Sequence, residues 1–265
     1  MERGAQLALA TGGFSHRALG LAKLIDEQRR ATWTITHNGA ALWDPEQRLV
    51  SHETMPVDAM RAVLSAAGPR VWCVYEALRG ADTTSIYYAG RHRHNLRHFV
   101  WGPRPPESAP DSRRALAPGV ERRRREPREE ELDRVLGAWL IGTPDALREL
   151  DATVEQGDLL GARYLHWSQR LADILGQPRL QIVGRDVGPL SVNKGVAATR
   201  LCARLGVPHN ATVAFGDADN DLEMLELAGT AVAMANATNR IREVAMLTAP
   251  ANTEDGVAAI LESWL

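Results

Sequence analysis

Residues 213–224, VAFGDADNDLEM, restrict the possible folds of this chain more than any other segment. A short apolar run that suits a buried strand stops at Gly216, and three carboxylates and an amide follow it: Asp217, Asp219, Asn220 and Asp221. In open parallel sheets, ligands bind beyond the carboxyl ends of the strands. Magnesium is usually held by one or two carboxylates together with substrate phosphate. The segment therefore predicts a metal- and phosphate-binding loop at the end of a parallel strand.

The same residues suit two other kinds of loop. Asp and Asn favour helix starts, so the same residues could serve only as a polar N-cap, but four such groups crowd a single strand end. The aspartates also match the first three positions of an EF-hand calcium loop, which then needs glycine at its sixth position and glutamate at its twelfth. Leu222 and Ala228 occupy those positions, so the EF-hand match fails.

Both ends of the chain alternate between strand and helix patterns. At the start, a strand at 6–10, a helix at 16–30 and a strand at 31–36 precede the turn His37-Asn38-Gly39. Near the end, we expect helices at 194–205, 222–227, 241–246 and 256–264 and strands at 212–215 and 230–234. This order predicts a doubly wound, Rossmann-like parallel α/β sheet.

The middle of the chain has a different pattern. We expect strands at 70–78, 83–89, 138–141, 162–166 and 180–183, and helices at 143–151 and 168–175. The charged run at 121–134 has mixed signs, which favours a solvated loop or an exposed helix start. We therefore predict a separate α+β module at 51–188, inserted into a core domain made of 1–50 and 189–265.

Composition argues against several classes of protein. The net charge of −2 gives no bulk field for nucleic acid or an anionic membrane. Cys73 and Cys202 form no disulfide framework or zinc motif, which fits a reducing cytoplasm. No apolar run is long enough to span a membrane, and no secretory leader is evident. The sequence does not indicate an oligomeric state.

Several segments resemble the motifs of one known family. Residues 216–225 resemble the fourth motif of haloacid dehalogenase-like phosphatases of the Cof type, with Ala218 in place of the usual glycine. Further matches occur in chain order at 8–12 (second motif), 38–40, 193–195 (third motif), 233–237 and 254–258. The resemblance implies a magnesium-dependent phosphatase acting on a small phosphorylated metabolite, such as a sugar phosphate or a phosphorylated cofactor.

The resemblance also implies roles for residues at the strand ends. Thr11, with Gly12 beside it, stands at the family's phosphate-binding hydroxyl, although threonine also caps turns. Lys194 stands where the family offsets the charge of the phosphate and the nucleophile. A cation is unfavourable at a helix N-terminus, so a nearby anion would explain its position.

In the fourth motif, the resemblance makes Asp217 a direct magnesium ligand and Asp221 a direct or water-mediated one. Asn220 would position the loop and the phosphate. Asn38 is a phosphate-site candidate that a turn explains equally well.

The family's first motif, Asp-x-Asp-Gly-Thr, does not occur in the chain. It supplies the nucleophile, so these 265 residues are expected to have negligible phosphatase activity. A late assigned start, a fragment or a decayed relative would each account for this. The intact third and fourth motifs argue against decay, and of the three we expect the late start. Gly13, where the family usually has arginine, favours decay.

In the family, an inserted cap domain closes over the site and selects substrate, and the resemblance makes 51–188 that cap. Candidate contacts in the middle of this chain are Arg91, His92, Arg93, His94, His98 and Arg185. The histidines lack the carboxylate or cysteine pattern of a metal cluster. The alternative to the phosphatase is a regulatory protein that keeps the phosphate pocket without the chemistry. A dinucleotide or P-loop domain lacks its glycine motif.

Overall fold

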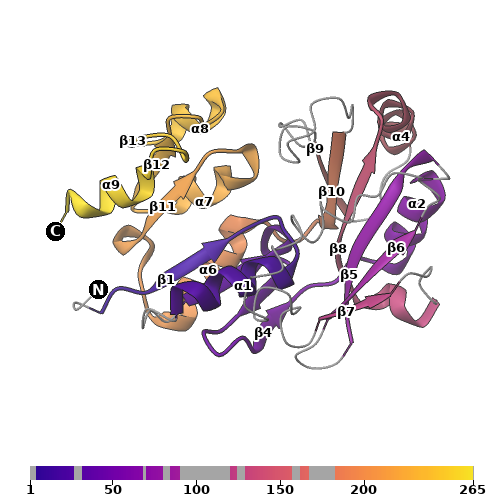
Figure 1. Cartoon of the computed structure of the whole chain (residues 1–265), viewed down its shortest axis with the longest axis horizontal. Coiled ribbons are helices and arrows are strands. Elements are labelled where there is room, and N and C mark those ends of the chain that lie inside the picture. Colours follow the sequence, from indigo (N-terminus) through magenta and orange to yellow (C-terminus); the bar gives the residue numbers. More distant parts are fainter. Residues whose placement is uncertain are drawn as a thin grey trace, which may run out of the picture.

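A computed structural model describes residues 4–26, 32–67, 70–79, 84–89, 120–123, 129–156, 162–166 and 183–264. Its strands form three sheets (Figure 1). Two of these sheets come from the ends of the chain, and the third comes from the middle.

The first sheet has the order β1-β2-β3-β4. Strand β1 (Leu7–Ala10) pairs in parallel with β2 (Thr32–Thr36), and helix α1 (Ser15–Asp26) lies between them in the chain. An antiparallel hairpin, β3 (Ala41–Trp43) and β4 (Leu49–His52), extends the sheet. The parallel pair brings the polar turns that follow β1 and β2 to the same edge.

The second sheet of the core is parallel throughout, in the order β11-β12-β13. Its strands are β11 (Val213–Gly216), β12 (Thr230–Met234) and β13 (Leu247–Ala249). The helices of this part are α6 (Lys194–Leu205), α7 (Leu222–Leu227), α8 (Asn239–Val244) and α9 (Gly256–Glu262). Helix α6 joins the two ends of the chain, because its apolar residues Ala197 and Leu201 pack with Trp33 and Ile35 of β2.

The middle of the chain forms a mainly antiparallel sheet in the order β7-β6-β5-β8-β10-β9. Its strands are β5 (Trp72–Leu78), β6 (Thr84–Ala89), β7 (Val120–Arg123), β8 (Val135–Gly142), β9 (Ala162–His166) and β10 (Val183–Pro189). Helices α2 (Val57–Ala67) and α4 (Pro144–Gln156) bury their apolar sides on one face of it, as Met60, Val63, Leu147 and Leu150 show. We call this α+β unit the cap.

The predicted class, a parallel α/β core with an α+β insertion, is confirmed, and several local predictions are corrected. Within the run predicted as a loop or helix start, Val120–Arg123 is a strand paired in parallel with β6. Of the strand predicted at 180–183, only Val183 is described; it begins β10, which continues to Pro189 beyond the predicted end. The helix predicted at 168–175 lies outside the described residues. The domain boundaries stay a prediction, although β4 already shows first-sheet pairing beyond residue 50.

Among the described residues, no helix has the length and apolar character needed to cross a membrane.

Gly39 is required where the turn after β2 meets helix α6. Its φ is 107°, and a Cβ there would lie 2.3 Å from the carbonyl oxygen of Asn193. We expect Gly39→Ala to lower the free energy of unfolding by about 2 kcal/mol or more, because strain and a backbone clash combine. Gly20→Ala is the matched control: it lies in α1 with open space at its Cβ, and we expect a gain of about 0.5–1 kcal/mol. Urea unfolding measures both, and equal effects would contradict this account.

Candidate phosphate site

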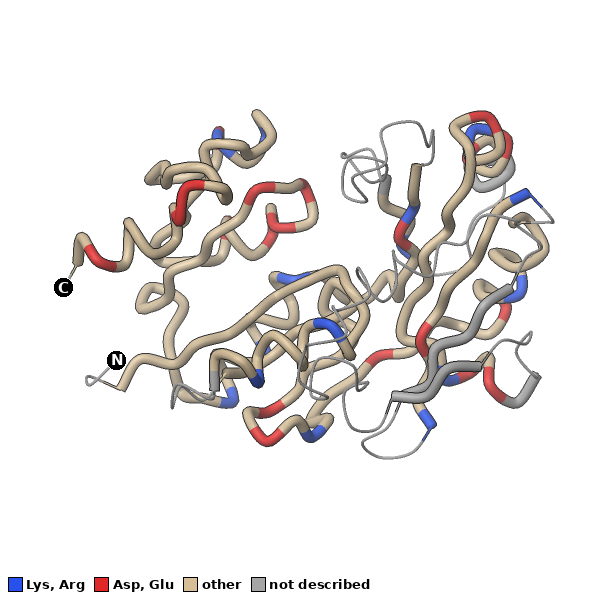
Figure 2. The backbone as a smooth tube through the Cα atoms, in the orientation of Figure 1, with Lys and Arg blue, Asp and Glu red and all other residues tan. Residues whose placement is uncertain are grey.

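The loop after β11 is folded around the carboxylate of Asp221. Its Oδ2 accepts hydrogen bonds from the backbone N–H groups of Asp217 (3.1 Å) and Ala218 (3.2 Å). Gly216 permits this return, since a Cβ there would lie 2.6 Å from the Cβ of Asp221. The carboxylate thereby fixes the shape of the loop that carries Asp217. Figure 2 shows acidic residues gathered on this loop.

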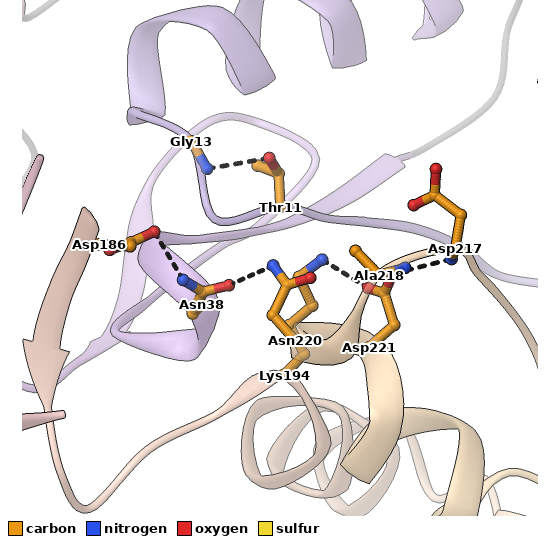
Figure 3. Close-up of polar contacts among 9 residues, drawn as sticks. All are labelled: Thr11, Gly13, Asn38, Asp186, Lys194, Asp217, Ala218, Asn220 and Asp221. Atoms are coloured by element: carbon orange, nitrogen blue, oxygen red, sulfur yellow. Dashed lines mark hydrogen bonds and ion pairs between the residues drawn. The ribbon is translucent and has the colours of Figure 1, made fainter. Parts of the chain in front are cut away.

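Lys194, the first residue of α6, forms a buried ion pair with Asp221. Its Nζ donates to Asp221 Oδ1 at 2.6 Å, and the two side chains are only 6% and 8% exposed. From the sequence we expect an anion near this lysine, because the helix N-terminus is already positive. The structure places an internal carboxylate there. The pair thus joins the third and fourth family motifs, as Figure 3 shows.

Asn220 and Asn38 also meet, from loops 182 residues apart in the chain. Asn220 Nδ2 donates to Asn38 Oδ1 at 2.8 Å. Asn38 has a left-handed φ of 53° in the turn after β2, a conformation that Asn tolerates better than most residues. The turn thereby aims a carboxamide into the site rather than only reversing the chain.

The loop after β1 is bonded to the same turn. Asn38 N donates to the Thr11 carbonyl at 3.1 Å, and His37 N donates to the Gly13 carbonyl at 3.2 Å. Thr11 Oγ1 accepts from Gly13 N at 2.9 Å, so this hydroxyl does cap a turn. As an acceptor there, the hydroxyl keeps its own proton for another partner. Gly12 lies against Asn38, since a Cβ would come within 2.9 Å of both amide atoms.

Asp217 differs from Asp221 in its surroundings. It is partly exposed, and its Oδ2 accepts from Asn236 Nδ2 at 2.9 Å. Among the described residues, its Oδ1 has no hydrogen-bond partner. In the described part of the chain, no group of three or more His, Cys, Asp or Glu side chains is placed to hold a metal. Asp219, the third carboxylate of this loop, is exposed and accepts a hydrogen bond from Thr238 Oγ1 at 2.8 Å.

Two cap carboxylates reach the core turns, and sequence reasoning missed both. Glu76 on β5 is fully buried, and its Oε2 accepts from Ser15 N and from His37 Nε2, each at 2.9 Å. Asp186 on β10 is 8% exposed, and its Oδ2 accepts from Asn38 Nδ2 at 2.8 Å. Glu76 is an acidic residue within the predicted strand 70–78, which was a weak signal, whereas Asp186 lies beyond the predicted strand 180–183 and gave none.

The cap residue named from the sequence lies elsewhere. Arg185 is bonded to Asp151 through Nε (2.9 Å) and Nη2 (2.6 Å). Successive strand residues point to opposite faces, so Arg185 faces away from the core while Asp186 faces it. The other candidate contacts, at 91–94 and 98, lie outside the described residues.

A separate hollow of about 460 Å³ lies at the other end of β1 and β2, near Gln6, Trp33 and Arg204. Ligands of parallel sheets bind at the carboxyl ends of the strands. The polar cluster of Lys194, Asp221, Asn220 and Asn38 lies at those ends. We therefore place the candidate site at the cluster and not in the hollow.

Comparisons with known proteins show which family this chain resembles. The sequence profile of haloacid dehalogenase-like hydrolases matches residues 181–261. Phosphatase YwpJ of Bacillus subtilis is 28% identical over 246 residues, covering 88% of this chain and 80% of that protein. 5-Amino-6-(5-phospho-D-ribitylamino)uracil phosphatase YitU of B. subtilis is 45% identical over 73 residues, but this match covers only 28% of the chain and 27% of that protein.

A solved structure extends the likeness to the whole fold. The chain resembles a haloacid dehalogenase-like hydrolase from Bacteroides thetaiotaomicron with a TM-score of 0.73 at 18% identity, covering 100% of this chain and 88% of the other. At that identity the likeness concerns the fold. With the profile match over residues 181–261 and the two relatives, the motifs at the strand ends support placing the chain in the haloacid dehalogenase-like superfamily, in its Cof-type branch.

Proposed function

We propose that the protein is a magnesium-dependent phosphatase that hydrolyses a small phosphomonoester through an aspartyl-phosphate. The observation that carries the proposal is the convergence of Lys194, Asp221, Asn220 and Asn38 at the ends of β2 and β11 (Figure 3). Phosphoryl transfer depends mainly on positioning and on neutralising negative oxygens. A compact cation with nearby amide donors serves both needs.

Each residue has a role that its position supports. The Thr11 hydroxyl donates to a phosphoryl oxygen. The missing side chain at Gly12 lets the loop after β1 lie directly against Asn38. Lys194 offsets the charge that accumulates on the phosphate. Asn220 and Asn38 hold the two loops in register around it.

The donor chemistry fits magnesium. Magnesium prefers oxygen ligands and commonly uses one or two carboxylates, with waters and substrate phosphate completing the shell. Asp217 has the exposure and the unpartnered oxygen for this task. Asp221 is the second candidate, although Lys194 already shares its charge. When bound, the ion would neutralise charge on the phosphoryl oxygens.

The nucleophile is expected on a strand between β1 and β11. In the described structure, both are edge strands of their sheets, and the two sheets share no strand pairing. Leu7, Leu9 and Phe215 remain only partly buried, whereas strands of parallel sheets are usually covered and paired. A strand paired to both edges would end between Thr11 and Asp217. We propose that it carries the attacking aspartate and comes from a segment outside these 265 residues.

YitU acts on a phosphoribitylamino uracil by its name. We propose a substrate of that general kind, a phosphorylated sugar or cofactor intermediate. A second function, phosphate-ligand binding without hydrolysis, is favoured by one observation: Asp221 is already engaged with Lys194 and the loop amides, so it is a poor nucleophile.

We expect these 265 residues alone to release negligible p-nitrophenol from p-nitrophenyl phosphate with magnesium, because they lack an attacking carboxylate. A fusion that supplies an Asp-x-Asp-Gly-Thr strand before β1 should gain magnesium-dependent activity. The same fusion with its first aspartate changed to asparagine is the control. Robust turnover by the unfused chain would contradict the proposed origin of the nucleophile. A stable, inactive fusion would favour the binding protein.

Lys194→Met tests the charge at the centre of the site. It leaves the buried carboxylate of Asp221 unpaired, and we expect a loss of about 3–5 kcal/mol in the free energy of unfolding. The double variant Lys194→Met, Asp221→Asn removes that charge and keeps an acceptor for the loop amides, so most of the stability should return.

Binding of inorganic phosphate with magnesium, measured by calorimetry, then separates stability from function. We expect both variants to lose binding, including the double variant that regains its stability. Phosphate affinity equal to the unchanged protein in the double variant would refute a phosphate role for Lys194.

A further inference from the structure

The cap sheet presents two faces of different chemistry. Residues directly opposite in an antiparallel pair share a face, and β8 pairs Gly137 with Glu76 and Trp139 with Asp186. The face that holds these residues lies against the core, where Trp139 packs on Phe14 with ring centroids 4.3 Å apart. The other face is apolar and covered by α2 and α4. Two carboxylates on the core-facing side are thus features of the cap–core contact.

Asp186 begins a chain of hydrogen bonds that runs from the cap to the loop after β11. Asn38 Nδ2 donates to Asp186 Oδ2 at 2.8 Å, and Asn220 Nδ2 donates to Asn38 Oδ1 at 2.8 Å. Figure 3 shows the three side chains in line. They come from β10, the turn after β2 and the loop after β11, which are the cap and the two halves of the core.

The chain has a fixed direction because an ionised carboxylate only accepts hydrogen bonds. Asp186 therefore turns the amide nitrogen of Asn38 toward itself and the amide oxygen toward Asn220. That oxygen in turn fixes which end of the Asn220 carboxamide points at Asn38. Without Asp186, either end of Asn38 could face Asn220.

The surroundings are built to fit this pair. A Cβ at Gly12 would lie 2.9 Å from both amide atoms of Asn38 and 3.1 Å from Asp186 Oδ2, so only glycine leaves the necessary room. Burial raises the pKa of Asp186 to about 6. Nearby positive charge and donated hydrogen bonds oppose that rise, and they come from His37, Arg163, Asn38 and Trp139. Keeping a carboxylate where its charge is costly points to a specific task.

We propose that Asp186 is a positioning residue: through Asn38 it sets the orientation of the Asn220 side chain. The loop after β11, here called the phosphate loop, then has its Asn220 side chain fixed only when the cap strand β10 rests on the core. This rests on the proposed function in one respect, that the organised loop binds phosphate. The coupling itself is a property of the protein without ligand.

The test follows the side-chain NH₂ groups of Asn38 and Asn220 by ¹H–¹⁵N NMR between pH 4.5 and 8. We expect both to titrate together with a midpoint near 6, although Asn220 has no direct contact with Asp186. In Asp186→Asn, which keeps the shape, both titrations should vanish.

Other ionisable groups are controlled in the same experiment. His37 lies on the turn beside Asp186, Glu76 is bonded to His37, and Arg163 on β9 is near both Asp186 and Glu223. All four are retained in Asp186→Asn. An Asn220 signal that still titrates in that variant, or that never titrates in the unchanged protein, would overturn the proposal.

Phosphate affinity provides the second readout. Removing the acceptor in Asp186→Ala should weaken binding of inorganic phosphate about tenfold, as for a lost hydrogen bond to a charged group. Asp186→Asn should stay within about threefold, since its amide oxygen can still accept. Unchanged affinity in a folded Asp186→Ala would overturn the positioning role. If the unchanged protein binds no phosphate, the proposed function fails, while the NMR coupling is judged on its own.

Discussion

The buried pair between Lys194 and Asp221 is the contact on which the site depends. It ties the first turn of α6 to the loop after β11, and Asp221 in turn holds the backbone of that loop through Asp217 and Ala218. Gly195 lets the two elements approach, since a Cβ there would lie 2.7 Å from the backbone of Glu223. Each charge of this buried pair depends on the other, because either partner alone would be a buried, uncompensated charge.

The same pair explains how two unpaired sheets share one site. Strands β1 and β11 have no ladder between them in the described structure, so side chains and α6 connect the halves. Helix α6 packs on β2 through Ala197 and Leu201, and its first residue reaches the other half. The contact between Asn220 and Asn38 is a second bridge. These bridges lie at the strand ends, and the edges of β1 and β11 carry no ladder in the described residues, which is where we propose that a further strand pairs.

The sequence predicted elements where periodicity and end signals were strong. Helix α6, between its Asn193 cap and left-handed Gly206, has the predicted bounds. The hairpin of β3 and β4 was missed because three- and four-residue strands carry too little alternation. Motif residues at strand ends could be named from their spacing. Glu76 and Asp186 could not be named from the sequence. Their roles depend on which face of the cap sheet meets the core, and strand register determines that face.

Register also decides which side chains of the cap contact the core. Glu76 accepts a backbone N–H from Ser15 and a hydrogen bond from His37, and Asp186 accepts from Asn38. Separating the cap from the core would expose both acids to water, which solvates carboxylates well, but would leave the core turns without the acceptors that shape them. Separating the cap from the core would therefore destabilise the core turns more than it destabilises the two carboxylates. The turn of His37 and Asn38 also contacts Asn220. In the coupling that we propose, loss of the cap contacts and loss of order in the loop after β11 therefore occur together.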